Sequence, residues 1–405
     1  MANKKGRPKR VGMLVHTIYI RDARVLKEAE CLVEAGYEVH VVCNRDVSSS
    51  GRFSEVPYEK VGDVYVYRIP IAKKRGNKFR YFFEYFGTCF LGAWRLALLH
   101  FRHRFGVIHI HNMPDILVFA GLVPKWLGAA LILDVHDPMN ELFEGTYKLP
   151  RSHPLFRIIR LQEKICYRIP DHLVTVSKPM AKNVAKKSGR SLASIKIIHN
   201  LPSLDKFPIR EDRKSWPYNE GNIIFLYSGT VTENYRLDIA VRAIAQISKT
   251  YPDVKFLILG KGNCLDQVVD LARNLGIEEK IELLKPVKHS EVKNVMALAD
   301  AGLSTHPAGP FGDLYFSTKV IEFMTQGLPV ISSRTKTLEE YIPEDSIFYF
   351  EPENLEDLVS QMLAMIENPE NVMEKVKKSK ELVKKLNWDE DKKNLITFYE
   401  ERINE

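Results

Sequence analysis

The sequence predicts an α/β protein of two domains, each built around a parallel β-sheet. Its 405 residues exceed what one compact hydrophobic core usually contains. Short apolar segments alternate with amphipathic helical segments, and this alternation is typical of parallel sheets covered by helices. A polar stretch with prolines at residues 204–221 separates two such series and indicates an interdomain linker.

The first series begins with a strand, a helix and a second strand joined by short links. Residues 10–15 are predicted as a buried strand, residues 24–35 as a helix that ends at Gly36, and residues 38–43 as the next strand. The first turn, HTIYIRDAR, lacks the G-x-G-x-x-G pattern, which disfavours a bound dinucleotide. Further strands are expected at residues 63–69, 107–110, 130–133, 172–177 and 195–198, the first of them as an exposed or edge strand.

The second series predicts another parallel sheet, followed by three helices. Its strands are expected at residues 223–227, 254–259, 280–284, 301–304, 329–331 and 347–350, and the helices at residues 353–366, 372–386 and 388–405. Apolar residues of the last helix, such as Trp388 and Phe398, are expected to pack on the first domain. The predicted domains are residues 1–204 and 205–386, with residues 387–405 returning to the first domain.

Overall charge and cysteine content narrow the functional class. The formal net charge of +8 predicts an anionic partner, although charge alone does not identify it. The five cysteines are widely spaced, without a C-x-x-C or Cys/His ligand pattern, so neither a disulfide framework nor a zinc site is indicated and a reducing, cytoplasmic environment is expected. No apolar run of about 18 residues predicts a membrane-spanning helix. No recognised nucleic-acid-binding module occurs.

Histidine and aspartate residues follow two neighbouring strands of the first predicted sheet. His111 begins the turn after one strand, and Asp134, His136 and Asp137 follow the next. In open parallel sheets, ligands bind beyond the carboxyl ends of the strands, so these residues are predicted to share a site. The alternative is a packed, structural histidine at a strand end.

The stretch at residues 316–332, FSTKVIEFMTQGLPVIS, is suited to a nucleotide diphosphate. Ser317, Thr318 and Lys319 open a predicted helix in which Glu322 is the only acidic residue. A helix N-terminus offers free N–H groups and a partial positive charge, so hydroxyls and a lysine there suit a phosphate. A carboxylate one turn deeper suits sugar hydroxyls. The alternative is an amphipathic helix with a capping serine and a solvated glutamate.

Residues 73–104 interleave cations with aromatic side chains. The residues concerned are Lys73, Lys74, Arg75, Lys78 and Arg80 with Phe79, Tyr81, Phe82, Phe83, Tyr85 and Phe86. On a helix, this combination favours contact with an anionic bilayer, where cations meet headgroups and rings enter the interface. The alternative is a core-facing helix with a cationic outer face.

Taken in order, these features resemble glycosyltransferase family 4, whose members are retaining enzymes of the GT-B fold. The resemblance extends from RDARVLKEAECLVEAGYEVHVV near the start to NWDEDKKNLITFYEERI near the end. It implies two Rossmann-like parallel-sheet domains that face each other across a cleft. The loop at residues 316–332 resembles the subgroup with a single glutamate, because Leu314 stands where other members have an upstream glutamate.

The resemblance assigns catalytic residues to the first domain and donor-binding residues to the second. HIHNMPD is similar to the turn whose histidine faces the reacting sugar, and LILDVHDPMNELF to an acceptor-side turn, which implies catalytic roles for His111, Asp134, His136 and Asp137. The implied donor-binding residues are Gly229, Thr230, Arg236, Gly260, Gly262, Val287, Ser317, Thr318, Lys319 and Glu322. Of these, Glu322 is expected to hold the donor ribose. No cofactor and no bound metal ion is implied.

The implied reaction moves a sugar, of hexosyl type, from a nucleoside-diphosphate sugar to an acceptor hydroxyl with retention of configuration. Arg236, Lys319 and the helix near Ser317 would stabilise the departing diphosphate. A glycan or lipid-linked acceptor is expected, in glycan, polysaccharide or glycolipid assembly, with the enzyme cytoplasmic or peripheral on the inner face of the membrane. Two alternatives stay open: a nucleotide-sugar 2-epimerase on the same fold, and a non-catalytic nucleotide-sugar-binding or membrane-scaffold protein.

Overall fold

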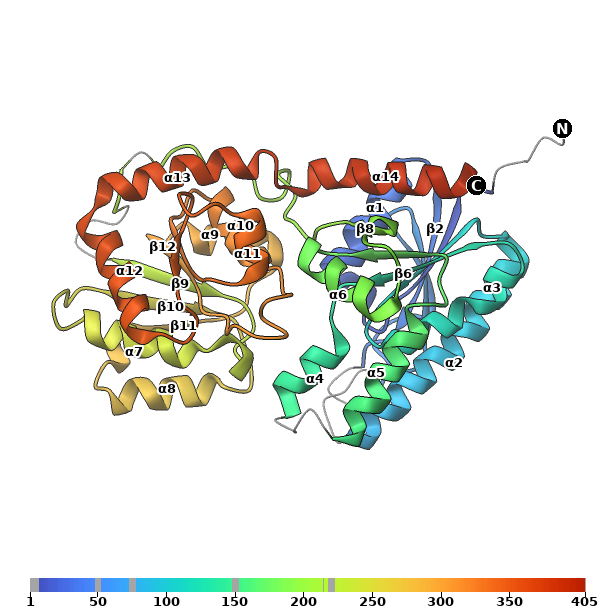
Figure 1. Cartoon of the computed structure of the whole chain (residues 1–405), viewed down its shortest axis with the longest axis horizontal. Helices are drawn as coiled ribbons and strands as arrows, with labels where there is room; N and C mark the ends of the chain where they lie inside the picture. Colours follow the sequence, from blue (N-terminus) through green and yellow to red (C-terminus); the bar gives the residue numbers. More distant parts are fainter. Residues whose placement is uncertain are drawn as a thin grey trace. The chain divides into compact units, whose positions relative to one another are not determined.

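The computed structural model describes residues 7–47, 52–72, 78–147, 153–213, 215–217 and 223–404. The chain divides into two compact units (Figure 1). Met1–His199 and Asp391–Glu405 form the first unit, and Asn200–Glu390 form the second. None of the helices in the described part of the chain has the length and apolarity that a bilayer crossing requires.

The first unit contains an eight-stranded sheet in the order β3-β4-β2-β1-β5-β6-β7-β8. The strands are β1 (Arg10–Leu14), β2 (Glu38–Asn44), β3 (Tyr58–Val61), β4 (Val64–Ile69), β5 (Val107–His111), β6 (Ala130–Val135), β7 (His172–Thr175) and β8 (Ile195–Ile197). Every pairing is parallel except that of β3 with β4. The predicted edge strand is therefore covered by β3, which apolar patterning missed because its sequence, YEKV, is half charged.

Helices cover both faces of this sheet. They are α1 (Ala23–Glu34), α2 (Lys78–His103), α3 (Leu122–Trp126), α4 (Met139–Tyr147), α5 (Pro154–Cys166), α6 (Lys178–Ser188) and α14 (Trp388–Asn404), with 3₁₀ turns η1 (Tyr19–Arg21), η2 (Asp115–Gly121) and η3 (Leu192–Ser194). On the α2 face, a Cβ added at Gly92 would lie 2.9 Å from the Leu14 side chain of β1. On the opposite face, His109 Nδ1 lies 2.6 Å from the Tyr399 hydroxyl of α14.

The second unit contains a wholly parallel six-stranded sheet in the order β11-β10-β9-β12-β13-β14. The strands are β9 (Ile224–Ser228), β10 (Lys255–Leu259), β11 (Ile281–Leu284), β12 (Ala301–Ser304), β13 (Val330–Ser333) and β14 (Phe348–Phe350). The helices are α7 (Leu237–Ile247), α8 (Leu265–Asn274), α9 (Val292–Met296), α10 (Thr318–Thr325), α11 (Lys336–Tyr341), α12 (Leu355–Glu367) and α13 (Pro369–Val383), with 3₁₀ turns η4 (Glu233–Tyr235), η5 (Glu278–Lys280) and η6 (His289–Glu291).

Alternate residues of the central strands of the second unit supply two separate cores. Phe225 and Phe256 pack with α7, α8 and α12, whereas Leu226 and Leu257 pack with α9 and α10 on the other face (Figure 1). This period of two explains why the strands are apolar throughout, because both faces are covered. The prediction of two parallel-sheet α/β domains is confirmed.

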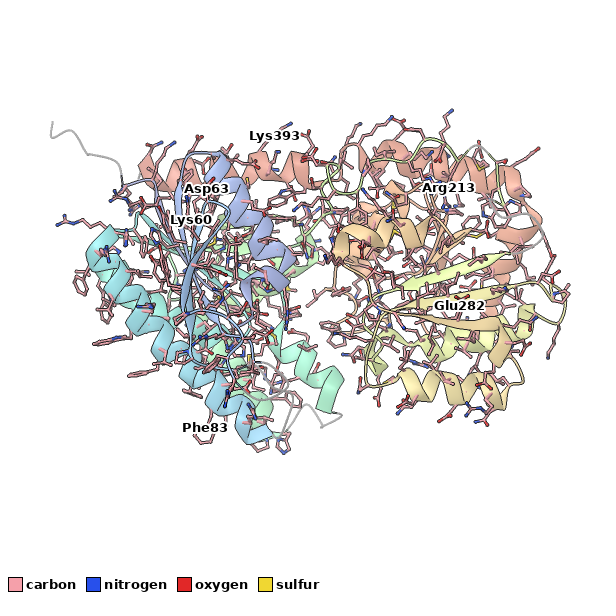
Figure 2. All side chains as sticks on the ribbon, turned by 180° about the vertical axis from the view of Figure 1, so that it is seen from behind. Lys60, Asp63, Phe83, Arg213, Glu282 and Lys393 are labelled. Carbon is pink, nitrogen blue, oxygen red and sulfur yellow. The ribbon has the colours of Figure 1, made fainter. Side chains whose placement is uncertain are left out.

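The stretch predicted as a linker is partly built into the second unit. Phe207 and Trp216 are buried, and the Trp216 indole donates to the Asp300 carbonyl over 3.1 Å. The Arg213 guanidinium, labelled in Figure 2, donates to the carbonyls of Met296, Ala297 and Ala299 near the end of α9. The polarity of residues 204–221 suggested a free linker. Instead, Arg213 satisfies carbonyl groups near the end of α9, and Phe207 and Trp216 each fill part of a hydrophobic core.

Candidate functional site

The second unit contains a cavity of about 390 Å³ at the carboxyl ends of β9 and β10. Ser228, Gly229 and Thr230 follow β9, and Gly260 and Lys261 follow β10. The loop after β11, around Val287, and the first turn of α10 supply the remaining walls. Ligands of open parallel sheets bind at this end of the strands, so the cavity occupies the position that the fold favours for a nucleotide.

Glycines allow the two loops to approach each other closely. Gly229 has φ of +145°, and a Cβ there would lie 3.1 Å from Lys319 Nζ. A Cβ at Gly260 would lie 1.8 Å from the Gly229 carbonyl oxygen, and one at Gly262 would lie 1.7 Å from the Val231 carbonyl oxygen. Any larger residue would therefore force these loops apart. This closeness places the backbone of Gly229 beside the Lys319 amine at the cavity.

Lys319 lies in the first turn of α10 with its amine buried inside the unit. Nζ lies 4.1 Å from the centroid of the Tyr227 ring and 4.5 Å from that of Tyr235. No described residue provides Nζ with a hydrogen bond. Burial lowers the pKa of Lys319 to about 7, against the opposing attraction of the Glu322 carboxylate. A buried, unsatisfied amine at a cavity is a strained arrangement that an anionic ligand would relieve.

Glu322 lies one turn further along α10 and also lines the cavity. Its Oε1 lies 3.1 Å from Nε2 of His289 in η6. The contact holds the carboxylate against the loop that carries Val287. The predicted ribose-binding position is thus fixed from two elements.

Six of the ten predicted donor-binding residues line this cavity. They are Gly229, Thr230, Gly260, Val287, Lys319 and Glu322. Gly262 lies beyond the lining and supports the loop. The buried Ser317 hydroxyl has no hydrogen-bond partner among the described residues, whereas the Thr318 hydroxyl donates to the Asn200 carbonyl over 3.1 Å. The two hydroxyls that open α10 therefore face different surroundings.

Arg236 does not line the cavity in this structure. Its guanidinium forms an ion pair with Asp238 over 2.9 Å and another with Glu353. The residue has φ of +46°, which ends η4 and directs the side chain toward the start of α7. Its role as a diphosphate ligand stays a prediction.

Aromatic and imidazole groups of the site were not recognised from sequence. Tyr235, His289 and Tyr315 line the cavity, and Tyr227 forms one wall of the lysine environment. Tyr235 and Tyr315 both pack against the His306 ring, with centroids 4.9 Å apart in each case. The position of His289 soon after β11 was the one available signal, because residues that follow parallel strands gather at one edge.

The predicted catalytic residues of the first unit belong to a buried polar cluster around Asp134. The Arg24 guanidinium donates to Asp134 through Nε over 2.7 Å and through Nη2 over 3.1 Å. His111 Nδ1 lies 3.3 Å from Asp134 Oδ2, and His136 Nδ1 lies 3.5 Å from the same oxygen. Arg24 also pairs with Glu28 over 3.1 Å. The structure thus brings His111, Asp134 and His136 together as sequence predicted.

Asn112 was missed by sequence reasoning and holds the turn that carries His136 and Asp137. Its Oδ1 accepts from the N–H groups of His136 and Asp137 over 3.0 and 3.2 Å. Its Nδ2 donates to the Asp137 carbonyl over 2.7 Å. Asp137 therefore lies at the site through its backbone, while its side chain is half-buried.

The ionisable groups of this cluster differ in their charge at neutral pH. Burial raises the pKa of Asp134, but the Arg24 charge and the two imidazoles outweigh it and hold that pKa well below its usual range. Burial opposes protonation of His136, yet its contact with Asp134 raises the His136 pKa to about 9. Burial lowers the pKa of His109 well below its usual value. At neutral pH, Asp134 is ionised, His136 is charged and His109 is neutral.

Glu28, His109, His111 and Asp134 also offer four donor atoms that lie within 4.8 Å of one another. A metal ion is disfavoured here because the Arg24 guanidinium already occupies both carboxylates. A cation placed among these atoms would be repelled by Arg24 and by protonated His136. The cluster is better described as an ion-pair network that fixes His111.

Two models of glycosyltransferase families together match most of the chain. Residues 23–205 match the model of Glycosyltransferase Family 4, and residues 208–385 match that of Glycosyl transferases group 1. The chain belongs to the GT-B glycosyltransferases. Curated relatives of this glycosyltransferase include the chitobiosyldiphosphodolichol beta-mannosyltransferase of Candida albicans, 23% identical over 52% of this chain and 48% of that protein. Another relative, from the human phosphatidylinositol N-acetylglucosaminyltransferase, is 21% identical over 88% of this chain and 69% of that one.

The glycosyltransferase thus spans about half of the first relative's length and about two thirds of the second's. Solved structures with the same fold include a sucrose-phosphate synthase from Thermosynechococcus elongatus, with a TM-score of 0.78, 15% identity and coverage of 97% of this chain and 98% of that one. Anabaena HepE, solved with UDP and glucose, has a TM-score of 0.69, 12% identity and coverage of 97% and 99%. At this identity, the likeness shows the fold alone.

Proposed function

We propose that this glycosyltransferase uses a nucleoside-diphosphate sugar as donor and binds it in the cavity of the second unit. The observation that carries the proposal is the Lys319 amine, buried between Tyr227 and Tyr235 without a hydrogen bond to any described residue. A diphosphate that enters the cavity would supply both the missing acceptor and the missing negative charge. Glu322, fixed by His289, would accept hydrogen bonds from ribose hydroxyls. HepE, of the same fold, was solved with UDP.

We further propose transfer of a hexosyl group to an acceptor hydroxyl with retention of configuration, in glycan or glycolipid assembly. The names of the curated relatives, which include phosphatidylinositol and dolichol-linked substrates, support a lipid-linked acceptor. No bound metal is proposed for this step, because Lys319 and the N–H groups at the start of α10 would meet the charge of the leaving diphosphate. His111, held by Asp134, is proposed to position or relay a proton near the transferred sugar.

Thermal stabilisation by added ligand tests whether the protein binds a nucleoside diphosphate and which nucleoside it prefers. Nucleoside diphosphates and nucleotide sugars of uridine, guanosine and adenosine should be titrated separately, since a ligand raises Tm in proportion to the logarithm of its concentration above Kd. One of them should raise Tm progressively, with EDTA leaving the shift unchanged. No response to any of the three nucleotides would remove the proposal.

Product analysis then separates transfer from the alternatives. Incubation with donor alone should leave the sugar unchanged, whereas conversion to a 2-epimer would identify an epimerase. Addition of lipid-linked acceptor should release nucleoside diphosphate and yield a glycoside whose anomeric configuration NMR reads directly. Donor binding without turnover would favour the non-catalytic alternative, and an inverted product would contradict retention.

We also propose that the first unit contacts an anionic bilayer through one face of α2. The face consists of Phe83, Phe86, Phe90, Trp94, Leu98 and Phe101, which are between 46% and 72% exposed. Their spacing of three and four residues places them along one stripe of the helix. Figure 2 shows Phe83 projecting away from the ribbon of α2. The predicted cations at residues 73–77 and the side chains of Lys78, Phe79, Tyr81 and Phe82 lie outside the described residues.

Helix α5 extends this surface with a second amphipathic face, which sequence reasoning did not single out. Leu155, Ile158, Leu161 and Ile165 are exposed, and the basic residues Arg157, Arg160 and Lys164 lie beside them. Both α2 and α5 pack against η2. Apolar side chains bordered by cations suit a surface of anionic lipid.

Replacing two rings of the α2 face should weaken vesicle binding. The double variant F90S/W94S should lose affinity for vesicles that contain phosphatidylglycerol by about a hundredfold or more, because each exposed aromatic side chain that becomes buried in the bilayer contributes roughly 1.5–3 kcal/mol. Co-sedimentation measures the affinity. The control variant L275S/L298S removes exposed apolar residues of the second unit and should bind as the wild type does. Equal binding by both variants would contradict the proposal.

A further inference from the structure

A second cavity lies in the first unit, between the sheet and the C-terminal half of α2. Its volume is about 580 Å³. Arg10 and Glu38, the first residues of β1 and β2, lie opposite each other in register and form one side. His111 and Asp134 lie at the other, carboxyl end of the same sheet. The cavity is therefore separate from the cluster around Asp134.

One wall of this cavity is a set of stacked rings. His40 of β2 is almost fully buried, and its ring stacks on Tyr65 of β4 with centroids 4.8 Å apart and planes at 20°. Its Nδ1 lies 3.2 Å from the Tyr67 hydroxyl. Tyr58 of β3 lies against Tyr67, with centroids 4.9 Å apart. Three adjacent strands thus contribute aromatic rings to one wall of the cavity.

The carboxylate in the cavity is already neutralised. Glu38 Oε1 lies 2.7 Å from His40 Nε2 and 3.3 Å from His103 Nδ1, and its Oε2 lies 3.4 Å from Arg10 Nε. Arg10 also donates to the His103 carbonyl over 2.9 Å. These contacts occupy both oxygens of the Glu38 carboxylate. The carboxylate therefore has little capacity to pair with another cation.

Two guanidinium groups at the cavity have no such compensation. Among the described residues, no carboxylate pairs with Arg95 or Arg102, although both line the cavity. The Arg95 guanidinium lies over the Tyr67 ring, 5.3 Å from its centroid. Both residues come from α2 and lie about two turns apart, so they present charge along the same side of the helix. The cavity has an excess of positive charge.

We propose that this cavity binds a phosphate ester. Arg95 and Arg102 would hold the phosphate, because guanidinium groups match the geometry of phosphate oxygens. The tyrosine rings would contact the organic part of the ligand. The volume falls within the range of roughly 300–1,000 Å³ that is usual for small-molecule sites. The site does not depend on donor binding in the second unit.

Two kinds of molecule carry a phosphate ester that this cavity could bind: a free sugar phosphate and the headgroup of an anionic lipid. Glucose 1-phosphate, titrated by calorimetry, represents the first, and vesicles with phosphatidic acid represent the second. Vesicles of equal charge made with phosphatidylserine control for non-specific attraction. Binding of glucose 1-phosphate, or a preference for phosphatidic acid over phosphatidylserine, supports the proposal and identifies the source.

The double variant R95Q/R102Q tests the residues. It should weaken binding of the responding probe by about a hundredfold, since each guanidinium supplies charge-assisted hydrogen bonds to the phosphate. The charge-matched control K182Q/K186Q changes two lysines of α6 and should bind normally. An unchanged Tm of the unliganded variant confirms its folding. Equal binding by both variants, no binding of either probe, or saturable Zn²⁺ binding at Glu38, His40 and His103 in place of phosphate would overturn the proposal.

Discussion

Lys319→Met should abolish most nucleoside-diphosphate binding and at the same time stabilise the unliganded protein. The positively charged Lys319 amine attracts the diphosphate in the wild type. Its loss should weaken binding by about tenfold to a hundredfold. Without ligand, the same amine is buried with no hydrogen bond to a described residue, so an apolar side chain of similar length suits the space between Tyr227 and Tyr235 better. Calorimetric binding and thermal unfolding measure the two effects.

The lowered pKa of Lys319 also determines how the stability of the wild type should change with pH. The folded-state pKa of Lys319 is about 7, below its ordinary value of 10.5, so the folded protein binds fewer protons than the unfolded chain between these values. The free energy of unfolding should therefore rise with pH over this window in the wild type, by on the order of 1.4 kcal/mol per pH unit, and lack this contribution in the variant. Affinity for the diphosphate should fall as pH rises above 7, because the Lys319 amine then loses its positive charge.

Lys336→Met provides the control for Lys319. Lys336 is exposed at the start of α11 and forms an ion pair with Asp313 at the surface, 3.0 Å away. Its replacement should change neither ligand affinity nor the pH profile by much, because exposed ion pairs contribute little. If Lys319→Met bound the diphosphate as tightly as Lys336→Met, the donor site would have to lie elsewhere.

Asp134→Asn should destabilise the first unit by about 3–5 kcal/mol. The substitution preserves shape, but it removes the negative charge and replaces one of the two carboxylate oxygens that accept from the buried Arg24 guanidinium, over 2.7 and 3.1 Å, by an NH2 group that cannot accept. Calorimetry of the unfolding transition of the first unit measures the loss. Asp63→Asn is the matched control, since the Asp63–Lys60 pair lies at the surface (Figure 2) and its loss should hardly change stability.

The destabilisation by Asp134→Asn should also depend on pH. Contact with Asp134 raises the pKa of His136 to about 9 in the folded state, against an ordinary value of 6.5. This contribution to stability is complete below pH 6.5 and disappears as pH rises through 9. The difference between wild type and variant should therefore be larger at pH 6 than at pH 10. A difference that is constant with pH would contradict the pairing of Asp134 with His136.

Much of the fold could be predicted because its signals are local. Apolar runs located β5, β6, β9 and β10, and the helical segments expected between consecutive strands indicated parallel pairing. The same rule placed Asp134 and Gly229 at carboxyl strand ends, where the structure has them. The strand β3 escaped this reasoning because its pairing with β4, rather than its own sequence, makes it a strand.

The character of the candidate site was decided by tertiary structure. Sequence placed Lys319 at a helix start, but the fold brings Tyr227 and Tyr235 from distant positions over its amine and removes it from water. Likewise, Arg24 from α1 becomes the partner of Asp134 only when helix and sheet pack. Helices and strands follow from residues a few positions apart, whereas burial, ion pairing and pKa depend on groups that meet only in the folded chain.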